Sequence, residues 1–130
     1  MEPDAIAEAV ESCTLAKSEW THHAHLAAGL AWVRRLGLEA AVPHARTCIR
    51  RYNESTGVAN TDHHGYHETI TRFFLTVLAG HAAVGSDLSA VLADPDVAHA
   101  APLRHWRRET LFSVRARREW VPPDRVGLPV

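Results

Sequence analysis

The hydrophobic residues of this chain recur every three to four positions, which is the spacing of one face of an α-helix. The pattern is clearest in residues 22–36 and 66–84, where an apolar stripe runs along one side of each segment. A sustained alternation of β-branched and polar residues, as in a half-buried strand, is nearly absent. The sequence therefore predicts an all-α fold, a compact bundle with these two segments at its centre.

Helix start and stop signals divide the chain into about five to six helices. Thr21 is a good N-cap for the helix that Gly37 ends, and Ser86 can cap a short helix that stops before Pro95. Residues 121–130 are rich in proline, so we expect them to form an extended tail. The predicted helices cover residues 3–11, 22–36, 39–53, 66–84, a short stretch after Ser86, and 103–120 with a break near Trp106.

Length and composition fit one globular domain over residues 1–130, with residues 1–120 mainly helical. Hydrophobic residues make up 46% of the chain and charged residues 22%, which is enough for a single core.

The net charge of −1 gives no electrostatic reason to bind nucleic acid or a membrane surface. No apolar run reaches the roughly 18 residues of a transmembrane helix. The acidic residues 1–4 do not resemble a secretory signal, so we expect a cytoplasmic protein.

Histidine is in excess, with ten in the chain. On a helical wheel, His22 and His25 share the apolar stripe of residues 22–36, with Cβ atoms roughly 5–6 Å apart. His67 begins the apolar stripe of residues 66–84 in the same way. These three imidazoles can meet if the two helices lie side by side with their N-terminal ends together.

A shared metal ion would satisfy three converging imidazoles, because neutral imidazole is the commonest protein ligand of zinc and iron. We therefore predict one divalent first-row ion, zinc or iron, bound by His22, His25 and His67. For any one of these histidines taken alone, a buried ring bonded to a backbone carbonyl is the commoner explanation. In that case no ion is present, and replacing His22 or His67 costs only packing energy.

Several polar residues near the predicted ion suggest further roles. Glu68 can act as a general base on metal-bound water, although a pair with Arg72 one turn away explains it equally well. Glu19 completes the spacing E-x-x-H-x-x-H and is an alternative ligand. Tyr66, Thr71 and Arg72 can contact the ligands of the ion or the substrate.

Two segments carry a resemblance to a known family. Residues 20–26 read W-T-H-H-A-H-L and residues 65–73 read G-Y-H-E-T-I-T-R-F. They resemble the W-T-H-x-x-H-L and G-Y-H-E-T-I-T-R-F motifs of a family of small, largely uncharacterised bacterial proteins, and residues 50–53 and 111–121 extend the likeness. The resemblance implies no particular reaction. The residues that it implies as part of the family pattern are His22, His25, His67 and Glu68.

The predicted function is that of a metal-dependent enzyme acting on a small molecule, since a three-histidine ion leaves positions open for water or substrate. The leading reaction is hydrolysis, or a lyase or isomerase step with Glu68 as base. The alternatives are an Fe(II)-dependent oxygenase and a non-catalytic helical module that binds a metal or small ligand. The arginines of residues 104–118 predict a solvated face or a clamp for an anion. The remaining apolar surface of residues 22–36 is available for a homodimer.

Overall fold

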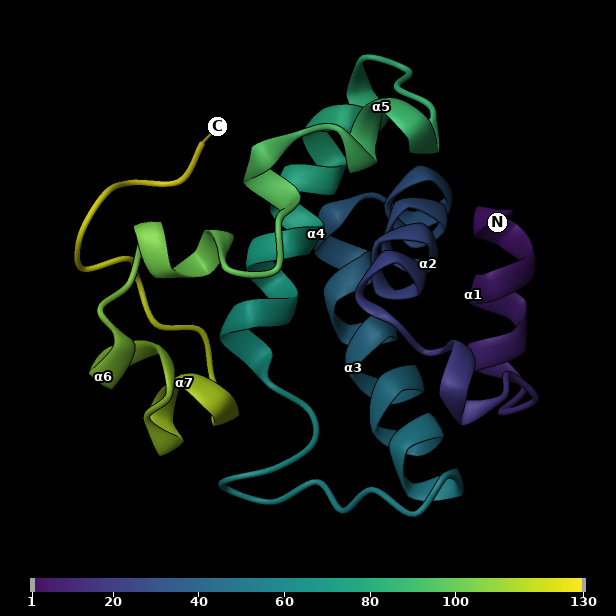
Figure 1. Cartoon of the computed structure of the whole chain (residues 1–130), viewed down its shortest axis with the longest axis horizontal. Helices are drawn as coiled ribbons and strands as arrows, with labels where there is room; N and C mark the ends of the chain where they lie inside the picture. The colour runs from purple at the N-terminus through teal and green to yellow at the C-terminus, as the bar shows by residue number, and fades with distance from the viewer. Residues whose placement is uncertain (1, 130) are drawn as a thin grey trace.

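The computed structural model describes residues 2–129, and every regular element within that range is a helix. No helix in that range is long and apolar enough to cross a bilayer. The predicted all-α bundle is confirmed. The longer helices are α1 (Pro3–Glu11), α2 (His22–Leu36), α3 (Leu38–Ser55) and α4 (Glu68–Ala83), drawn in purple to teal in Figure 1. The shorter elements are the 3₁₀ helices η1 (Lys17–Glu19), η2 (Pro95–Val97) and η3 (Ala101–Arg104) and the α-helices α5 (Leu88–Leu92), α6 (Arg108–Leu111) and α7 (Val114–Arg118).

The N-termini of α2 and α4 are each capped by a side chain. Thr21 Oγ1 accepts a hydrogen bond from the N–H of Ala24 at 3.2 Å, as its sequence position predicts. His67 plays the same part for α4, because its Nδ1 accepts from the N–H of Ile70 at 3.1 Å. Helix α4 therefore begins at Glu68 rather than at residue 66, and His67 stands just outside it.

The helical stretch predicted over residues 103–120 is broken next to Trp106, as predicted, and also at Ser113, which was not predicted. The chain forms η3, α6 and α7, separated by extended residues at Arg107 and Ser113. Ser113 has φ −71° and ψ 156°, and its Oγ accepts from the N–H of Ala116 to cap α7. A serine with a helix former three positions later is an N-cap signal, and the sequence analysis did not use this signal at Ser113.

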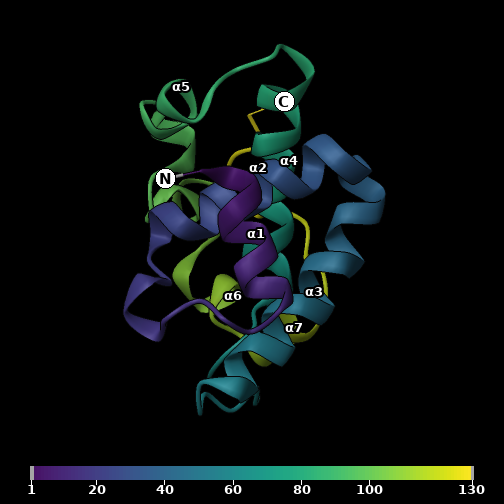
Figure 2. The same cartoon turned by 90° about the vertical axis from the view of Figure 1, so that its right-hand side faces the viewer.

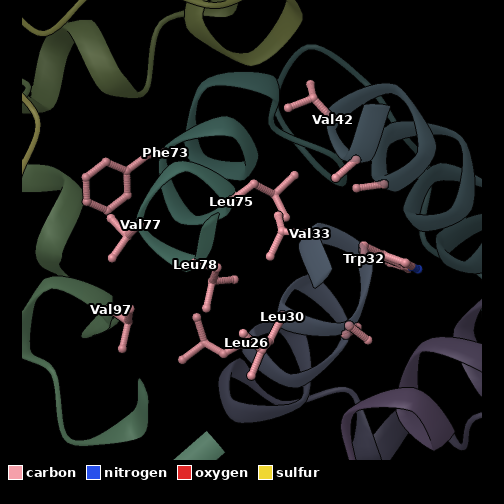
Figure 3. Packing of buried hydrophobic residues seen from close by; sticks show 14 of the residues in the cluster. Leu26, Leu30, Trp32, Val33, Val42, Phe73, Leu75, Val77, Leu78 and Val97 are labelled. Carbon is pink, nitrogen blue, oxygen red and sulfur yellow. The ribbon is translucent and has the colours of Figure 1, made fainter. Parts of the chain in front are cut away.

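Helix α2 lies in the middle of the bundle, with α1 on one side and α4 on the other (Figures 1 and 2). Figure 3 shows the side chains of Leu26 and Leu30 on the side of α2 where Leu78 of α4 lies. The indole of Trp32 points away from α4. Two helices that were predicted to be central are therefore in contact, and α1 covers the opposite side of α2.

The C-terminal segment is extended, as predicted, and is attached by hydrogen bonds to α4 and to Trp106, which lies between η3 and α6. Thr69 Oγ1 donates to the carbonyl of Glu119 at 2.8 Å and accepts from the N–H of Val121 at 3.1 Å. Trp106 Nε1–H donates to the carbonyl of Val121 at 2.9 Å. This attachment holds residues 99–112 close to α2 and α4, where they form part of the candidate site.

Candidate functional site

His22 and His25 both line a cavity beside α2, as their spacing on one helix face predicts. The Nε2–H of His22 donates to the carbonyl of Val97 at 2.7 Å, and the Nδ1–H of His25 donates to that of Thr21 at 2.7 Å. A neutral imidazole that donates through one nitrogen accepts through the other. Nδ1 of His22 and Nε2 of His25 are therefore acceptor atoms, suited to a ligand N–H or O–H or to a metal ion.

Both of these imidazoles are neutral at neutral pH. Burial lowers the pKa of His22, against the opposing effect of its hydrogen bond to Val97. His25 stacks on the indole of Trp20 with 3.6 Å between ring centroids. Desolvation of the ring by the surrounding protein atoms lowers the pKa of His25 to about 4. The His25 side chain keeps solvent contact through the open side of the cavity. The neutral form is the one that can accept a hydrogen bond or coordinate a metal.

The cavity has a volume of about 630 Å³ and opens to solvent. Leu26 of α2 and Leu75 and Leu78 of α4 form one part of its wall, and residues 99–112 form another. The volume falls within the roughly 300–1,000 Å³ of small-molecule sites, and like them the cavity has mainly apolar walls. The hydrogen-bonding and charged side chains on the wall are His22, His25, Trp32, Thr71, His99 and Arg108. The indole N–H of Trp32 is already bonded to Glu11.

His99 is a wall residue that the sequence analysis did not single out, and Arg108 is one of the arginines predicted to form a solvated face or an anion clamp. The His99 ring meets that of His22 edge to face, with centroids 5.4 Å apart. The guanidinium of Arg108 lies over the ring of Phe112, 5.6 Å from its centroid. His99 sits between η2 and η3, where no helical periodicity marks it. Its contact with α2 depends on the chain folding back after α5, which no local pattern signals.

His67 does not join the other two predicted ligands. Its Nδ1 caps α4, and its Nε2–H donates to the carbonyl of Leu111 at 2.7 Å, so both ring nitrogens bond to protein. The start of α2 meets the middle of α4, where the ring of Phe74 lies 5.2 Å from that of His22. Phe74 is about two turns, or roughly 10 Å, beyond His67. Among residues 2–129, the predicted three-histidine cluster is therefore not formed.

Glu68 is buried beside Arg46 and Tyr66 and lies off the cavity wall. Its carboxylate accepts from Nε and Nη2 of Arg46 at 2.8 and 2.7 Å and from the hydroxyl of Tyr66 at 2.8 Å. Burial alone would raise the pKa of Glu68, but these hydrogen bonds outweigh it and the pKa is lowered. A paired carboxylate with a lowered pKa is a weak base, so this geometry does not favour Glu68 as the predicted general base.

The other residues with predicted roles lie in different places. Arg72 pairs with Glu39 at 3.4 Å rather than with Glu68, and its guanidinium lies 5.6 Å from the centroid of the Trp120 ring. Glu19 is exposed in η1. Thr71 lines the same cavity as His22 and His25. It is the one residue among Glu19, Tyr66, Thr71 and Arg72 that does so.

A second group of metal-binding residue types lies between α1 and α3. Glu11, His44 and Cys48 each offer one donor atom, and these atoms all lie within 4.8 Å of one another. His44 Nε2 is 2.6 Å from Glu11 Oε2 and 3.5 Å from Cys48 Sγ. This group could hold a metal ion. The H-x-x-x-C spacing was visible in the sequence, but the carboxylate partner comes from another helix.

Comparisons with models of protein families, with curated proteins and with solved structures found no match for this chain. The likeness of residues 20–26 and 65–73 to the two histidine motifs therefore stays a resemblance. Functional inference for this protein depends on the cavity beside α2 and on the group between α1 and α3.

Proposed function

We propose that this protein binds a small, mainly apolar organic molecule in the cavity between α2, α4 and residues 99–112. The observation that carries the proposal is a solvent-open cavity of about 630 Å³ whose wall is apolar except for a few hydrogen-bonding and charged groups. Apolar walls supply the free energy of binding, and a small number of placed polar groups set orientation and selectivity. Binding itself, with or without a reaction, is the function that this geometry supports best.

The wall groups suggest the chemistry of the ligand. Nδ1 of His22 and Nε2 of His25 accept hydrogen bonds, so they fit a ligand that carries an N–H or O–H group. Arg108 contributes a permanent positive charge beside the ring of Phe112. We therefore expect a molecule with an apolar body and a carboxylate, sulfonate or similar anionic group.

The fluorescent probe 1-anilinonaphthalene-8-sulfonate combines aromatic rings with a sulfonate and tests this proposal directly. Its fluorescence should rise on binding to the wild-type protein. Thr71→Phe, which fills the cavity, should abolish most of this binding, and Arg108→Gln should weaken it several-fold by removing the charge.

Arg107→Gln is the matched control, because Arg107 is an exposed neighbour of Arg108 that does not line the cavity. It should bind the probe like the wild type. Equal binding by Thr71→Phe and the wild type, or equal losses in the two arginine variants, would show that the probe sits elsewhere and would overturn the proposal.

A second candidate keeps the metal-dependent enzyme predicted from the sequence. It is favoured by His22 and His25 each donating one ring N–H to a backbone carbonyl, as metal-ligating histidines commonly do. The ion would be zinc or iron, and His99 would turn to become its third histidine ligand. The reaction would be a hydrolysis, a lyase or isomerase step, or an oxygenation. The test is made in the untagged Cys48→Ser protein, which lacks the thiol of the group between α1 and α3. Metal that is still bound after adding His23→Ala, but is lost after adding His22→Ala, would support this candidate. Less than about one-tenth equivalent in the wild type would count against it.

A further inference from the structure

We propose that Glu11, His44 and Cys48 form a zinc site that joins α1 to α3, independent of the cavity beside α2. A thiolate, an imidazole and a carboxylate are the three side-chain ligand types that zinc takes in proteins. A cysteine sulfur makes magnesium or calcium unsuitable, because both prefer oxygen ligands. Three protein ligands leave the fourth tetrahedral position for water.

Helix geometry already sets the spacing of two of these ligands. His44 and Cys48 are four residues apart on α3 and so lie on the same face. Their Nε2 and Sγ atoms are 3.5 Å apart. Tetrahedral zinc with bonds of about 2.0 Å to nitrogen and about 2.3 Å to sulfur separates those ligand atoms by about 3.5 Å. These two side chains therefore fit the ion without moving apart.

The carboxylate of Glu11 needs a small adjustment. Its Oε2 lies 2.6 Å from His44 Nε2, the distance of a hydrogen bond through a shared proton. Tetrahedral zinc would separate the two atoms to about 3.3 Å. When zinc binds, the proton between Glu11 and His44 leaves for Nδ1 of the ring or for solvent, and the Cys48 thiol gives its proton to solvent. A partly exposed side chain at the end of α1 can make this shift.

Two further groups contact the Glu11 oxygen that faces His44. The indole Nε1–H of Trp32 donates to Glu11 Oε2 at 3.1 Å, and the exposed guanidinium of Arg35 lies 3.4 Å from the same atom. Hydrogen bonds of this kind orient carboxylate ligands in metal sites. Arg35 can turn into solvent as the positive ion arrives, whereas the buried Trp32 stays in place.

A cobalt titration of the untagged, reduced protein tests the site, because Co²⁺ takes zinc positions and a thiolate ligand gives a near-ultraviolet charge-transfer band. We expect the band to saturate at one equivalent in the wild type and to disappear on adding Zn²⁺. Cys48→Ser should lose the band. It should also weaken cobalt binding by more than the roughly 10–100-fold that is lost when a residue hydrogen-bonded to a metal ligand is replaced. Cys13→Ser is the matched control, since it removes the other free cysteine, and His22→Ala removes a cavity histidine; both should keep the band.

Melting curves of the metal-free proteins show whether Cys48→Ser still folds, and Cys48→Ala serves as a second variant that introduces no buried hydroxyl. Zinc should raise the melting temperature of the wild type and of Cys13→Ser but of neither Cys48 variant. The proposal is overturned if the wild type shows no charge-transfer band, if the band survives in a folded Cys48 variant, or if it is lost in His22→Ala.

Discussion

An imidazole ring has two nitrogens, and the structure uses them differently in the three histidines that the sequence singled out. His22 and His25 each donate through one nitrogen and keep an acceptor on the other. His67 bonds through both, to the N–H of Ile70 and to the carbonyl of Leu111. His67 is therefore a structural residue that caps α4 and ties it to α6.

Replacing His67 with alanine should lower the free energy of unfolding by about 2–3 kcal/mol, because it removes a helix cap and leaves a buried carbonyl without its donor. His67→Asn keeps a short side-chain acceptor for Ile70 and should recover about 1 kcal/mol of that loss. Urea unfolding at pH 8, followed by circular dichroism, measures both variants. Equal stability of the alanine variant and the wild type would contradict the structural role.

The contribution of His67 should also depend on pH. Burial lowers its pKa in the folded protein, while the unfolded chain takes up the proton near the ordinary value of about 6.5. The stability that His67 adds is therefore complete above about pH 6.5 and declines as the pH falls toward the lowered pKa. The gap in unfolding free energy between wild type and His67→Asn should accordingly narrow from pH 7.5 to pH 5.

At the scale of helices, the contact between α2 and α4 depends on Gly29. A Cβ atom at this position would lie 2.7 Å from Cδ1 of Leu78 and 3.3 Å from Cδ2 of Leu75. Both leucines line the cavity, so the absence of a side chain at Gly29 sets how far they extend into it. The glycine is thus part of the packing that shapes the site.

Two glycine-to-alanine changes separate helix propensity from this packing. Gly80 is exposed in α4 with open space around its Cα, so Gly80→Ala should raise the free energy of unfolding by about 0.5–1 kcal/mol. Gly29→Ala makes the same gain in propensity but must displace Leu78, and overpacking costs about 1–3 kcal/mol. We expect a net loss of up to about 2 kcal/mol from chemical unfolding curves. A stabilisation of Gly29→Ala equal to that of Gly80→Ala would show that the helices do not pack this closely.

At the scale of the whole molecule, the sequence predicted the features that lie within one helix, such as its ends and its buried face. It did not predict the contacts between residues of different helices. The 3.6-residue period correctly placed His22 and His25 on one face of α2, and Thr21 and Gly37 correctly marked its ends. The period carries no information on how far one helix slides along another, so it could not show that His22 meets Phe74 rather than His67. The same limit hid Glu11, Arg46 and His99, whose partners lie on other elements.

The wall that residues 99–112 add to α2 and α4 has a consequence for biosynthesis. A ribosome releases the chain from its N-terminus, so the central helices emerge well before this stretch does. Until residues 99–112 are synthesised, the leucines of α2 and α4 that line the cavity are exposed to water and to neighbouring nascent chains. During this interval more apolar surface is open to water than in the folded protein, so we expect the tendency to aggregate to be highest then.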